Sequence, residues 1–289
     1  MQTKLINKPP TRLFAFGCSF TKYNWATWPE IIAHDLDIPF YNYGKSGGGN
    51  QYITNMICQA DEFYKFTSDD LVIVSWTNVC REDKWKKGGW ITPGNIFTQN
   101  EYDPAYIKNW ADPIGYMIRD FATIKLISSL LKNSGCQYHL LSMCDIDIQI
   151  DQGNANIIDP NFKSFYDTVC QTYKKELDQI LPSFFKTLWK NDIYRNKLLP
   201  DKELYGNKFS DGHPNPKDHY IFLKEIFDHK FSESTDNAVK KSQNNLVKFI
   251  QDTSNIKKKE FAVYNLNFEE LQNLESSTQI KISERIKFF

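Results

Sequence analysis

The chain lacks the long apolar segments of a membrane protein. No stretch of about 18 consecutive apolar residues occurs anywhere in it. The first residues run from Met1 to Pro9 and Pro10 without the apolar core of a secretory signal. These absences predict a cytoplasmic protein that neither spans nor binds a membrane.

The chain also lacks an excess of charge of either sign. Its 35 lysines and arginines balance its 35 aspartates and glutamates. A nucleic-acid-binding domain needs a surplus of basic residues to meet the phosphate backbone. We therefore expect no nucleic acid among its partners.

Closely spaced cysteine pairs, which are typical of zinc sites, are missing too. The six cysteines stand far apart, at positions 18, 58, 80, 136, 144 and 170. A chain of 289 residues buries enough apolar surface to fold without disulfides, so we expect reduced thiols. A run of acidic residues suggests calcium as an alternative, but it lacks the glycine spacing of an EF-hand loop; it comprises Asp145, Asp147, Asp151 and Asp159. The expected protein needs no cofactor and no metal.

What the chain does have is a regular alternation of strand-like and helix-like segments. Short apolar runs typical of buried strands occur near 12–16, 39–42, 71–76 and 137–143. Segments with helical spacing occur near 26–36, 50–66, 116–133 and 216–230. This alternation predicts an α/β fold, a three-layer α/β/α sandwich with a central parallel sheet.

A serine follows the first predicted strand. Gly17 ends the apolar run, and Ser19 comes two residues later. Residues just past the carboxyl ends of parallel strands lie where α/β sheets place their chemistry. Ser19 is therefore a candidate nucleophile, with a helix cap or a turn residue as the alternative.

An aspartate and a histidine near the end of the predicted domain can activate Ser19. A serine hydroxyl needs a base to accept its proton and a carboxylate to orient that base. Alternate residues of an extended stretch point the same way, so the Asp211 carboxylate can reach Nδ1 of His213 while Nε2 faces Ser19. The alternative is an ordinary surface turn, because the segment is rich in turn-forming residues.

Two further segments can supply donors to the oxyanion of a tetrahedral intermediate. Asn78 comes just after the most apolar predicted strand, and its side-chain amide is one candidate donor. The backbone N–H of Gly47 is the other, with Gly44 as its alternative. The glycines near 44–49 also suggest a phosphate-binding loop, but no Gly-Lys-Ser or Gly-Lys-Thr closes the run.

Cys18 is a rival nucleophile, because a thiolate is intrinsically stronger than a hydroxyl. Neighbouring residues of an extended segment point in opposite directions. One of the two residues Cys18 and Ser19 should therefore face the core, and cysteine is buried more readily than serine. We expect Ser19 to be the reacting residue.

The order of these segments resembles that of the SGNH (GDSL-like) hydrolase superfamily, over residues 10–230. Gly-Cys-Ser-Phe at 17–20 is similar to a variant of the first block of that family. The resemblance implies the flavodoxin-like SGNH hydrolase fold. It also implies a set of roles: Ser19 as nucleophile, His213 as base, Asp211 as its orienter, and Gly47 and Asn78 as oxyanion donors together with the Ser19 N–H.

The same resemblance implies a serine esterase that hydrolyses ester-linked acyl groups through an acyl-serine intermediate. O-acetyl groups on carbohydrate are the favoured substrates, so the expected partner is a small-molecule or saccharide ester. Two alternatives stay open: an acyltransferase with the same triad, and a catalytically inactive glycan-binding or assembly protein.

Two parts of the chain extend beyond this minimal plan. The segment 80–115 is rich in aromatic residues and is either a sugar-stacking platform or a small satellite core; its candidate substrate-binding residues are Trp85, Trp90 and Trp110. The second part begins near residue 232, where 232–237 resembles a linker. We thus expect an α/β domain at 1–231 and a mainly helical extension at 232–289, through which a partner or a second copy is able to dock.

Overall fold

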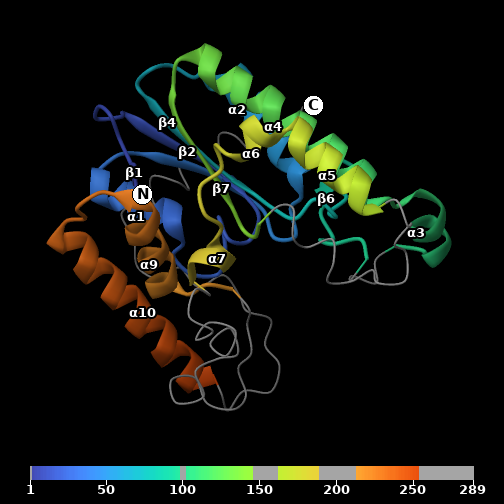
Figure 1. The fold of residues 1–289 in the computed structure, drawn as a ribbon. Coiled ribbons are helices and arrows are strands. Elements are labelled where there is room, and N and C mark those ends of the chain that lie inside the picture. Colours follow the sequence, from blue (N-terminus) through green and yellow to red (C-terminus); the bar gives the residue numbers. More distant parts are fainter. Residues whose placement is uncertain (1, 98–101, 146–161, 189–212, 254–289) are drawn as a thin grey trace.

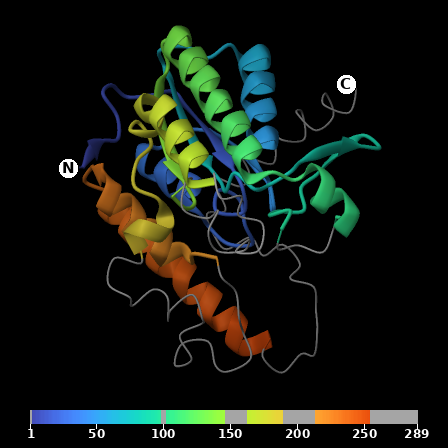
Figure 2. The same cartoon turned by 45° about the vertical axis from the view of Figure 1, so that its right-hand side comes forward.

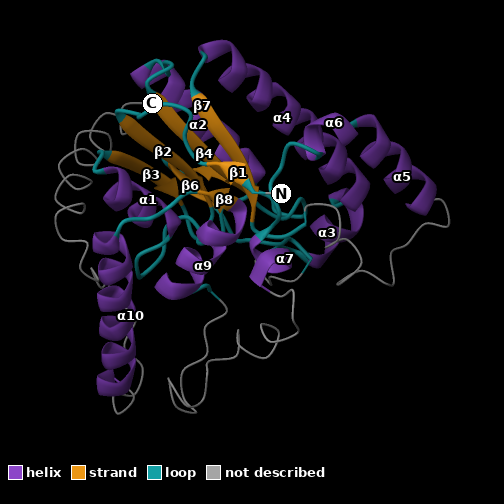
Figure 3. Ribbon diagram, turned by 60° about the vertical axis from the view of Figure 1, so that its left-hand side comes forward, coloured by secondary structure: helices purple, strands orange, loops and turns teal. Residues whose placement is uncertain are grey.

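A parallel sheet of four strands forms the centre of the molecule (Figure 1). The computed structural model describes residues 2–97, 102–145, 162–188 and 213–253. The strand order is β3 (Phe40–Gly44), β2 (Arg12–Gly17), β4 (Asp70–Trp76) and β7 (Gln137–Ser142), and each neighbouring pair is parallel. Helices cover both faces (Figure 3), which confirms the predicted three-layer α/β/α sandwich.

The two faces of the sheet are both apolar because alternate side chains of each central strand point to opposite sides. In β2, Leu13 and Ala15 belong to one buried cluster, whereas Phe14 and Phe16 belong to the other. Strand β4 is buried along its whole length. The continuous apolar runs in the sequence follow from this two-sided burial.

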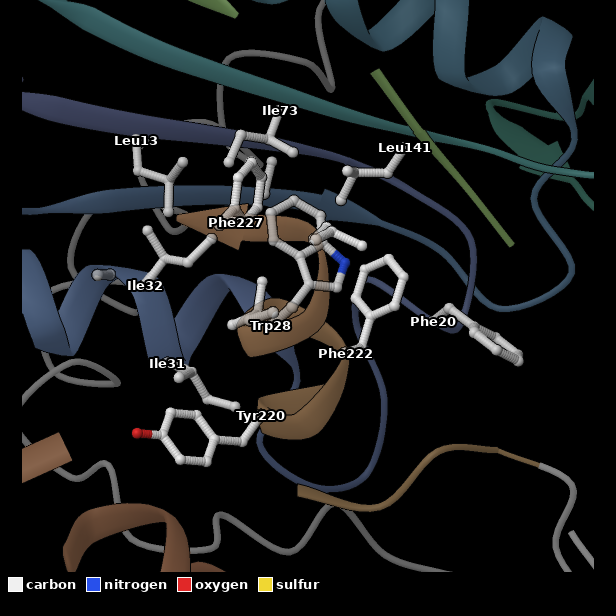
Figure 4. Packing of buried hydrophobic residues seen from close by; sticks show 14 of the residues in the cluster. Leu13, Phe20, Trp28, Ile31, Ile32, Ile73, Leu141, Tyr220, Phe222 and Phe227 are labelled. Atoms are coloured by element: carbon white, nitrogen blue, oxygen red, sulfur yellow. The ribbon is translucent and has the colours of Figure 1, made fainter. Parts of the chain in front are cut away.

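The first face carries α1 (Trp28–Leu36), α7 (Phe184–Leu188) and α9 (Pro216–Ile226). Figure 4 shows this packing, in which Trp28 and Phe222 fill the space beneath Ile73 and Leu141. Helix α9 begins at the N-cap Asn215, whose side chain accepts from the backbone N–H of Asp218 at 3.0 Å. The predicted helix at 216–230 ends earlier, at Ile226, because Phe227–Asp228 (β8) pairs with Thr3–Lys4 (β1).

The second face carries α2 (Asn50–Tyr64), α4 (Pro113–Ser134), α5 (Phe162–Thr172) and α6 (Lys174–Leu177). Helix α4 is the longest of them and contacts the other three. Asp112 caps its first turn by accepting from the N–H of Gly115 at 2.8 Å, and Gly135 ends it in a left-handed conformation.

The aromatic segment folds as a small satellite beside the sheet (Figure 2), made of β5 (Lys84–Lys86), β6 (Gly89–Ile91) and α3 (Pro104–Trp110). Glu82 lies at its centre. The hydroxyls of Tyr106 and Tyr116 donate to the Glu82 carboxylate, and Tyr102 donates to the Glu82 carbonyl. Burial acts to raise the pKa of Glu82, but the hydrogen bonds from Tyr106 and Tyr116 and the charge of Lys84 together outweigh it, so the pKa is lowered.

The start of the C-terminal extension differs from the prediction. Residues 232–237 are not a linker, because α10 (Glu233–Thr253) begins at Glu233 and contacts α1 and α9. Thr235, Val239, Ser242 and Leu246 are its buried residues on that side. The rest of the extension, 254–289, lies outside the described residues. Within the described ranges no helix is both long and apolar enough to cross a membrane.

Candidate active site

The turn that carries Ser19 starts where β2 ends. The N–H groups of Thr21 and Lys22 both donate to the carbonyl of Cys18, at 2.9 and 3.2 Å. A Cβ on Gly17 would lie 2.0 Å from Thr21 Oγ1, so the turn closes this tightly only with glycine at that position. Ser19 therefore has a fixed place at the carboxyl edge of the sheet, between the ends of β3 and β4.

His213 lies directly against Ser19. Its Nε2 atom is 2.8 Å from Ser19 Oγ, although the two residues are far apart in the sequence. This is the separation at which an imidazole accepts a hydroxyl proton. The ring of Tyr23 stacks on the imidazole with centroids 3.9 Å apart, and Phe20 contacts it at 5.7 Å. Residues from the serine turn thus hold both the distance and the tilt of the imidazole.

The segment after His213 is tied to the same turn by a buried hydrogen bond. Trp25 Nε1 donates to the carbonyl of Pro214 at 2.7 Å. On the other side, Asn215 starts α9, so the histidine is held between an indole and a helix N-terminus. Pro214 and Pro216 are both buried and restrict the backbone on either side of Asn215.

Cys18 faces away from His213 and into the core. Its side chain is fully buried, and Sγ lies 3.8 Å from Sδ of Met143. This placement matches the expectation that one residue of the pair is buried. The hydroxyl of Ser19, and not the thiol of Cys18, is the group that meets the imidazole.

The glycine loop, residues 44–49, contains the predicted backbone donor to the oxyanion, the N–H of Gly47. The N–H of Gly44 donates to the side chain of Asn42, that of Gly48 to the carbonyl of Lys45, and that of Gly49 to Asp83. The amide of Gly44, the predicted alternative to Gly47, is therefore occupied, and so are those of Gly48 and Gly49. Gly47 has a positive φ of 71°, and a Cβ there would lie 2.0 Å from the carbonyl of Thr92. A side chain at this position would therefore displace either the loop or the residues just after β6.

Asn78 is buried just beyond β4, and its side chain is oriented by its own loop. The Oδ1 atom accepts from the N–H of Cys80 at 2.6 Å, which fixes the orientation of the side-chain amide. The backbone of Thr77, the residue before Asn78, is also held in place by a side chain. Asn50 accepts from the N–H of Thr77 at 2.9 Å and donates to its carbonyl at 3.0 Å.

A buried ion pair supports this clamp from α4. Asp120 accepts from Asn50 Nδ2 at 2.8 Å and pairs with Arg119 at 2.6 Å. Burial raises the pKa of Asp120 to about 6, against the opposing effect of Arg119. Asp83, which comes from the segment after β4, is a second buried carboxylate near the site. It accepts from the N–H of Gly49 and of Tyr52 at the start of α2. Burial raises the pKa of Asp83 too.

A second histidine close to the site has a different character. His219 is fully buried in α9, and its pKa falls to about 3, chiefly by burial and then by the charge of nearby His213. It is therefore neutral at ordinary pH and packs against the ring of Phe184.

The sequence also predicted a role for Asp211 and suggested a calcium site at the acidic residues in 145–159. Asp211, the predicted orienter of His213, lies outside the described residues, as do Asp147, Asp151 and Asp159. Asp145 is described and accepts from the hydroxyl of Ser183 at 2.6 Å. Within the described ranges no three His, Cys, Asp or Glu side chains are grouped to hold a metal.

The three predicted substrate-binding tryptophans differ in exposure. Trp85 and Trp90 pair across the β5–β6 hairpin with perpendicular rings, and Trp90 also contacts the ring of Tyr52. Trp110 lies at the end of α3 and is 75% exposed. The hairpin adjoins the glycine loop, because Thr92 Oγ1 donates to the carbonyl of Ser46 at 2.8 Å.

Comparison with known proteins gives likenesses of fold. The chain is similar to solved structures of esterases and of the lipolytic G-D-S-L family. One is a G-D-S-L family protein from Veillonella parvula, with 15% identity, a TM-score of 0.38, and coverage of 76% of this chain and 99% of that one. Another is a catalytic mutant of an acetylxylan esterase from Geobacillus stearothermophilus, with 15% identity, a TM-score of 0.39, and coverage of 76% and 96%.

A third similar structure is a psychrotrophic esterase from a Pseudoalteromonas species, with 13% identity, a TM-score of 0.39, and coverage of 75% and 96%. No protein-family model matches the chain, and no curated protein matches it.

Sequence reasoning missed several residues that hold the site together. Tyr23 and Trp25 follow the serine closely, but nothing in their spacing indicates a partner near residue 213. Arg81 and Met143 lie at the ends of recognised segments, three residues after Asn78 and one residue after β7. Their positions just past the ends of predicted strands were the sequence signal that could have identified them as site residues.

Proposed function

We propose that the protein is a serine esterase that hydrolyses ester-linked acyl groups through an acyl-serine intermediate. The observation that supports this most directly is the 2.8 Å contact between Ser19 Oγ and His213 Nε2. The contact lies at the carboxyl edge of a parallel sheet, where α/β enzymes bind their substrates. The buried position of Cys18 supports serine rather than cysteine as the nucleophile.

The reaction proceeds in two halves. His213 Nε2 accepts the proton of Ser19 while Oγ attacks the acyl carbon, and the oxyanion receives hydrogen bonds from Asn78 Nδ2 and the N–H groups of Gly47 and Ser19. His213 then gives its proton to the departing alcohol oxygen, which leaves an acyl-serine. In the second half a water gives its proton to His213, attacks the acyl carbon, and the proton returns to Ser19 Oγ.

In this proposal Asp211 orients the imidazole from the Nδ1 side. Tyr23 and Trp25 share that task through the stacked ring and the hydrogen bond to Pro214.

Carbohydrate O-acetyl esters are the proposed substrates. The support for this class is the pair of tryptophans on the β5–β6 hairpin, which adjoins the glycine loop and is able to offer a stacking surface to a sugar ring. Transfer of the acyl group to a sugar hydroxyl instead of water would use the same residues.

The test is covalent labelling with a fluorophosphonate, together with turnover of p-nitrophenyl acetate. We expect the wild type and Cys18→Ala to be labelled and active. Ser19→Ala should be neither, and His213→Ala should lose several orders of magnitude, with little further loss in the double variant. Labelling that persists in Ser19→Ala and disappears in Cys18→Ala would refute the assignment.

A further inference from the structure

Arg81 differs from the other arginines in the described part of the chain. Arg12 forms a two-point ion pair with Asp70, at 2.7 and 2.9 Å, and Arg119 pairs with Asp120 at 2.6 Å. Within the described ranges, no carboxylate lies within ion-pair distance of Arg81. A guanidinium partly removed from water without an ion-paired anion carries a desolvation cost, which an anionic ligand would relieve.

The donors of Arg81 are incompletely used. Nη1 donates to the carbonyl of Gly48 at 2.9 Å, and Nη2 contacts Sδ of Met143 at 3.5 Å. A thioether is a weak acceptor, so the second contact is easily replaced by a stronger one. Nε is buried and has no hydrogen-bond partner among the described residues. The side chain as a whole is only partly buried, so a ligand can reach it.

The guanidinium lies where the three segments of the proposed site meet. Gly48 adjoins Gly47 in the loop. Met143 Sδ lies 3.8 Å from Sγ of Cys18, the residue before Ser19. The same sulfur lies 3.8 Å from Oγ1 of Thr77, the residue before Asn78. Gly48 thus adjoins one oxyanion donor, and Met143 contacts the residues just before the nucleophile and just before Asn78, so an anion on Arg81 would lie close to the scissile ester.

The carboxylate of Asp83 limits how much negative charge a ligand bound to Arg81 can carry. The charge of Arg81 lowers the pKa of Asp83, which shows that the two residues interact, although burial raises that pKa more. The oxygens of Asp83 are occupied by the N–H groups of Gly49 and Tyr52. A singly charged, planar carboxylate fits one guanidinium with a second carboxylate nearby better than a phosphate dianion does.

We propose that Arg81 binds a carboxylate carried by the ester substrate, so that the preferred substrates are acidic esters. The inference rests on the proposed esterase function and narrows its substrate class. The carboxylate belongs either to the sugar, as in an acetylated uronic acid, or to the acyl group, as in a half-ester of a dicarboxylic acid. Both present the same ion to Arg81.

The experiment compares matched acidic and neutral esters. Acetylated glucuronic acid is paired with acetylated glucose, and the p-nitrophenyl half-ester of adipic acid is paired with p-nitrophenyl hexanoate. The variants are Arg81→Gln, which loses the charge, and Arg81→Lys, which keeps it. Lys125→Gln removes one exposed positive charge from α4, away from the site, and serves as the control.

We expect Arg81→Gln to lower kcat/KM for one acidic ester by about 10- to 100-fold and to change its neutral partner by less than about threefold. Arg81→Lys should recover part of the loss, and Lys125→Gln should change neither ester. The acidic pair that responds identifies which side of the ester carries the carboxylate. Equal losses on acidic and neutral esters would overturn the proposal, because Arg81 would then hold the loop or the oxyanion donors in place.

Binding to Ser19→Ala separates this inference from the proposed function. Calorimetry with glucuronate and with adipate needs no turnover. Loss of binding when Arg81→Gln is added to Ser19→Ala would support the carboxylate site even if no ester were hydrolysed. Turnover of neutral esters together with absence of acid binding and of any acidic preference would leave the esterase proposal intact and refute the role of Arg81.

Discussion

Trp25 Nε1 donates to the carbonyl of Pro214 at 2.7 Å, and this hydrogen bond ties the segment after His213 to the segment after Ser19. The indole is buried and its ring contacts Tyr23, which stacks on His213. The serine turn therefore supports the histidine as well as the nucleophile. A substitution of Trp25 should therefore misplace the imidazole of His213.

Trp25→Phe keeps the aromatic ring and removes the donor. A buried carbonyl left without a partner costs about 1–3 kcal/mol, so the melting temperature should fall. We also expect kcat to drop about tenfold with little change in KM, because the imidazole loses part of its alignment and the substrate contacts stay. Kinetics on p-nitrophenyl acetate and thermal melts measure both effects. A raised KM at constant kcat would contradict a role in alignment.

Asn78→Ala tests the side-chain donor of the oxyanion hole. The amide meets a charge that develops only in the transition state, so kcat should fall by about 10²–10³ while KM stays nearly constant. Asn78→Asp should be as harmful, since an ionised carboxylate offers no donor. If the loss appeared in KM alone, Asn78 would be a binding residue.

Two glycines with similar backbone angles allow a matched test of the loop. Gly47 has a φ of 71° and Gly88 has a φ of 80°, but a Cβ meets the Thr92 carbonyl at Gly47 and nothing within 4 Å at Gly88. Gly88→Ala should therefore cost only the strain of a left-handed residue, about 1–2 kcal/mol, and leave activity unchanged. Gly47→Ala should cost more and should also lower kcat, as the amide moves with the loop. Equal effects of the two changes would exclude a special role for Gly47.

The tryptophans of the aromatic segment should separate by substrate size. Trp85→Ala and Trp110→Ala change exposed rings, so we expect the melting temperature to hold while turnover of acetylated saccharides falls and p-nitrophenyl acetate is spared. Trp90→Ala should lower the melting temperature as well, because that ring packs on Tyr52 and Trp85. Uniform losses on both substrates from all three variants would show that the segment is only a satellite core.

Asp120 should make the stability of the protein depend on pH. Its folded pKa of about 6 lies above the ordinary value of 3.8, so the folded protein holds this proton more tightly than the unfolded chain does. The contribution of Asp120 to stability is therefore largest at low pH and declines as the pH rises from about 4 to 6. Denaturant unfolding of wild type and Asp120→Asn at pH 4.5 and 7.5 measures it. The wild type should lose up to a few kcal/mol relative to the variant on going to the higher pH, and no change in the difference would refute the raised pKa.

The sheet and the position of Ser19 were predictable because both depend on local pattern. The apolar runs at β2 and β4 reflect strands buried on both faces, and Gly17 marks the end of the first. The orientation of Cys18 into the core was also within reach, since it follows from the alternation of side chains in an extended segment.

Features that depend on contacts between distant segments were not predictable. The end of α9 at Ile226 is set by the pairing of Phe227 with Thr3, a contact between opposite ends of the described chain. Likewise, 232–237 has the composition of a linker, yet it starts a helix because that helix packs on α1 and α9. Among the described residues Arg81 has no ion-pair partner, and this is a tertiary property too, because the nearby sequence does not show that the Asp83 carboxylate accepts from the first turn of α2.

The satellite is organised around Glu82, and this has a consequence for how the protein can diversify. Three tyrosine hydroxyls converge on Glu82, and Lys84 lies over two of those rings. The outward-facing rings of Trp85 and Trp110 take no part in these contacts. Substitutions at these two rings can therefore change the outer surface of the satellite, and with it the range of esters admitted, while the contacts of Glu82 keep the interior of the satellite intact.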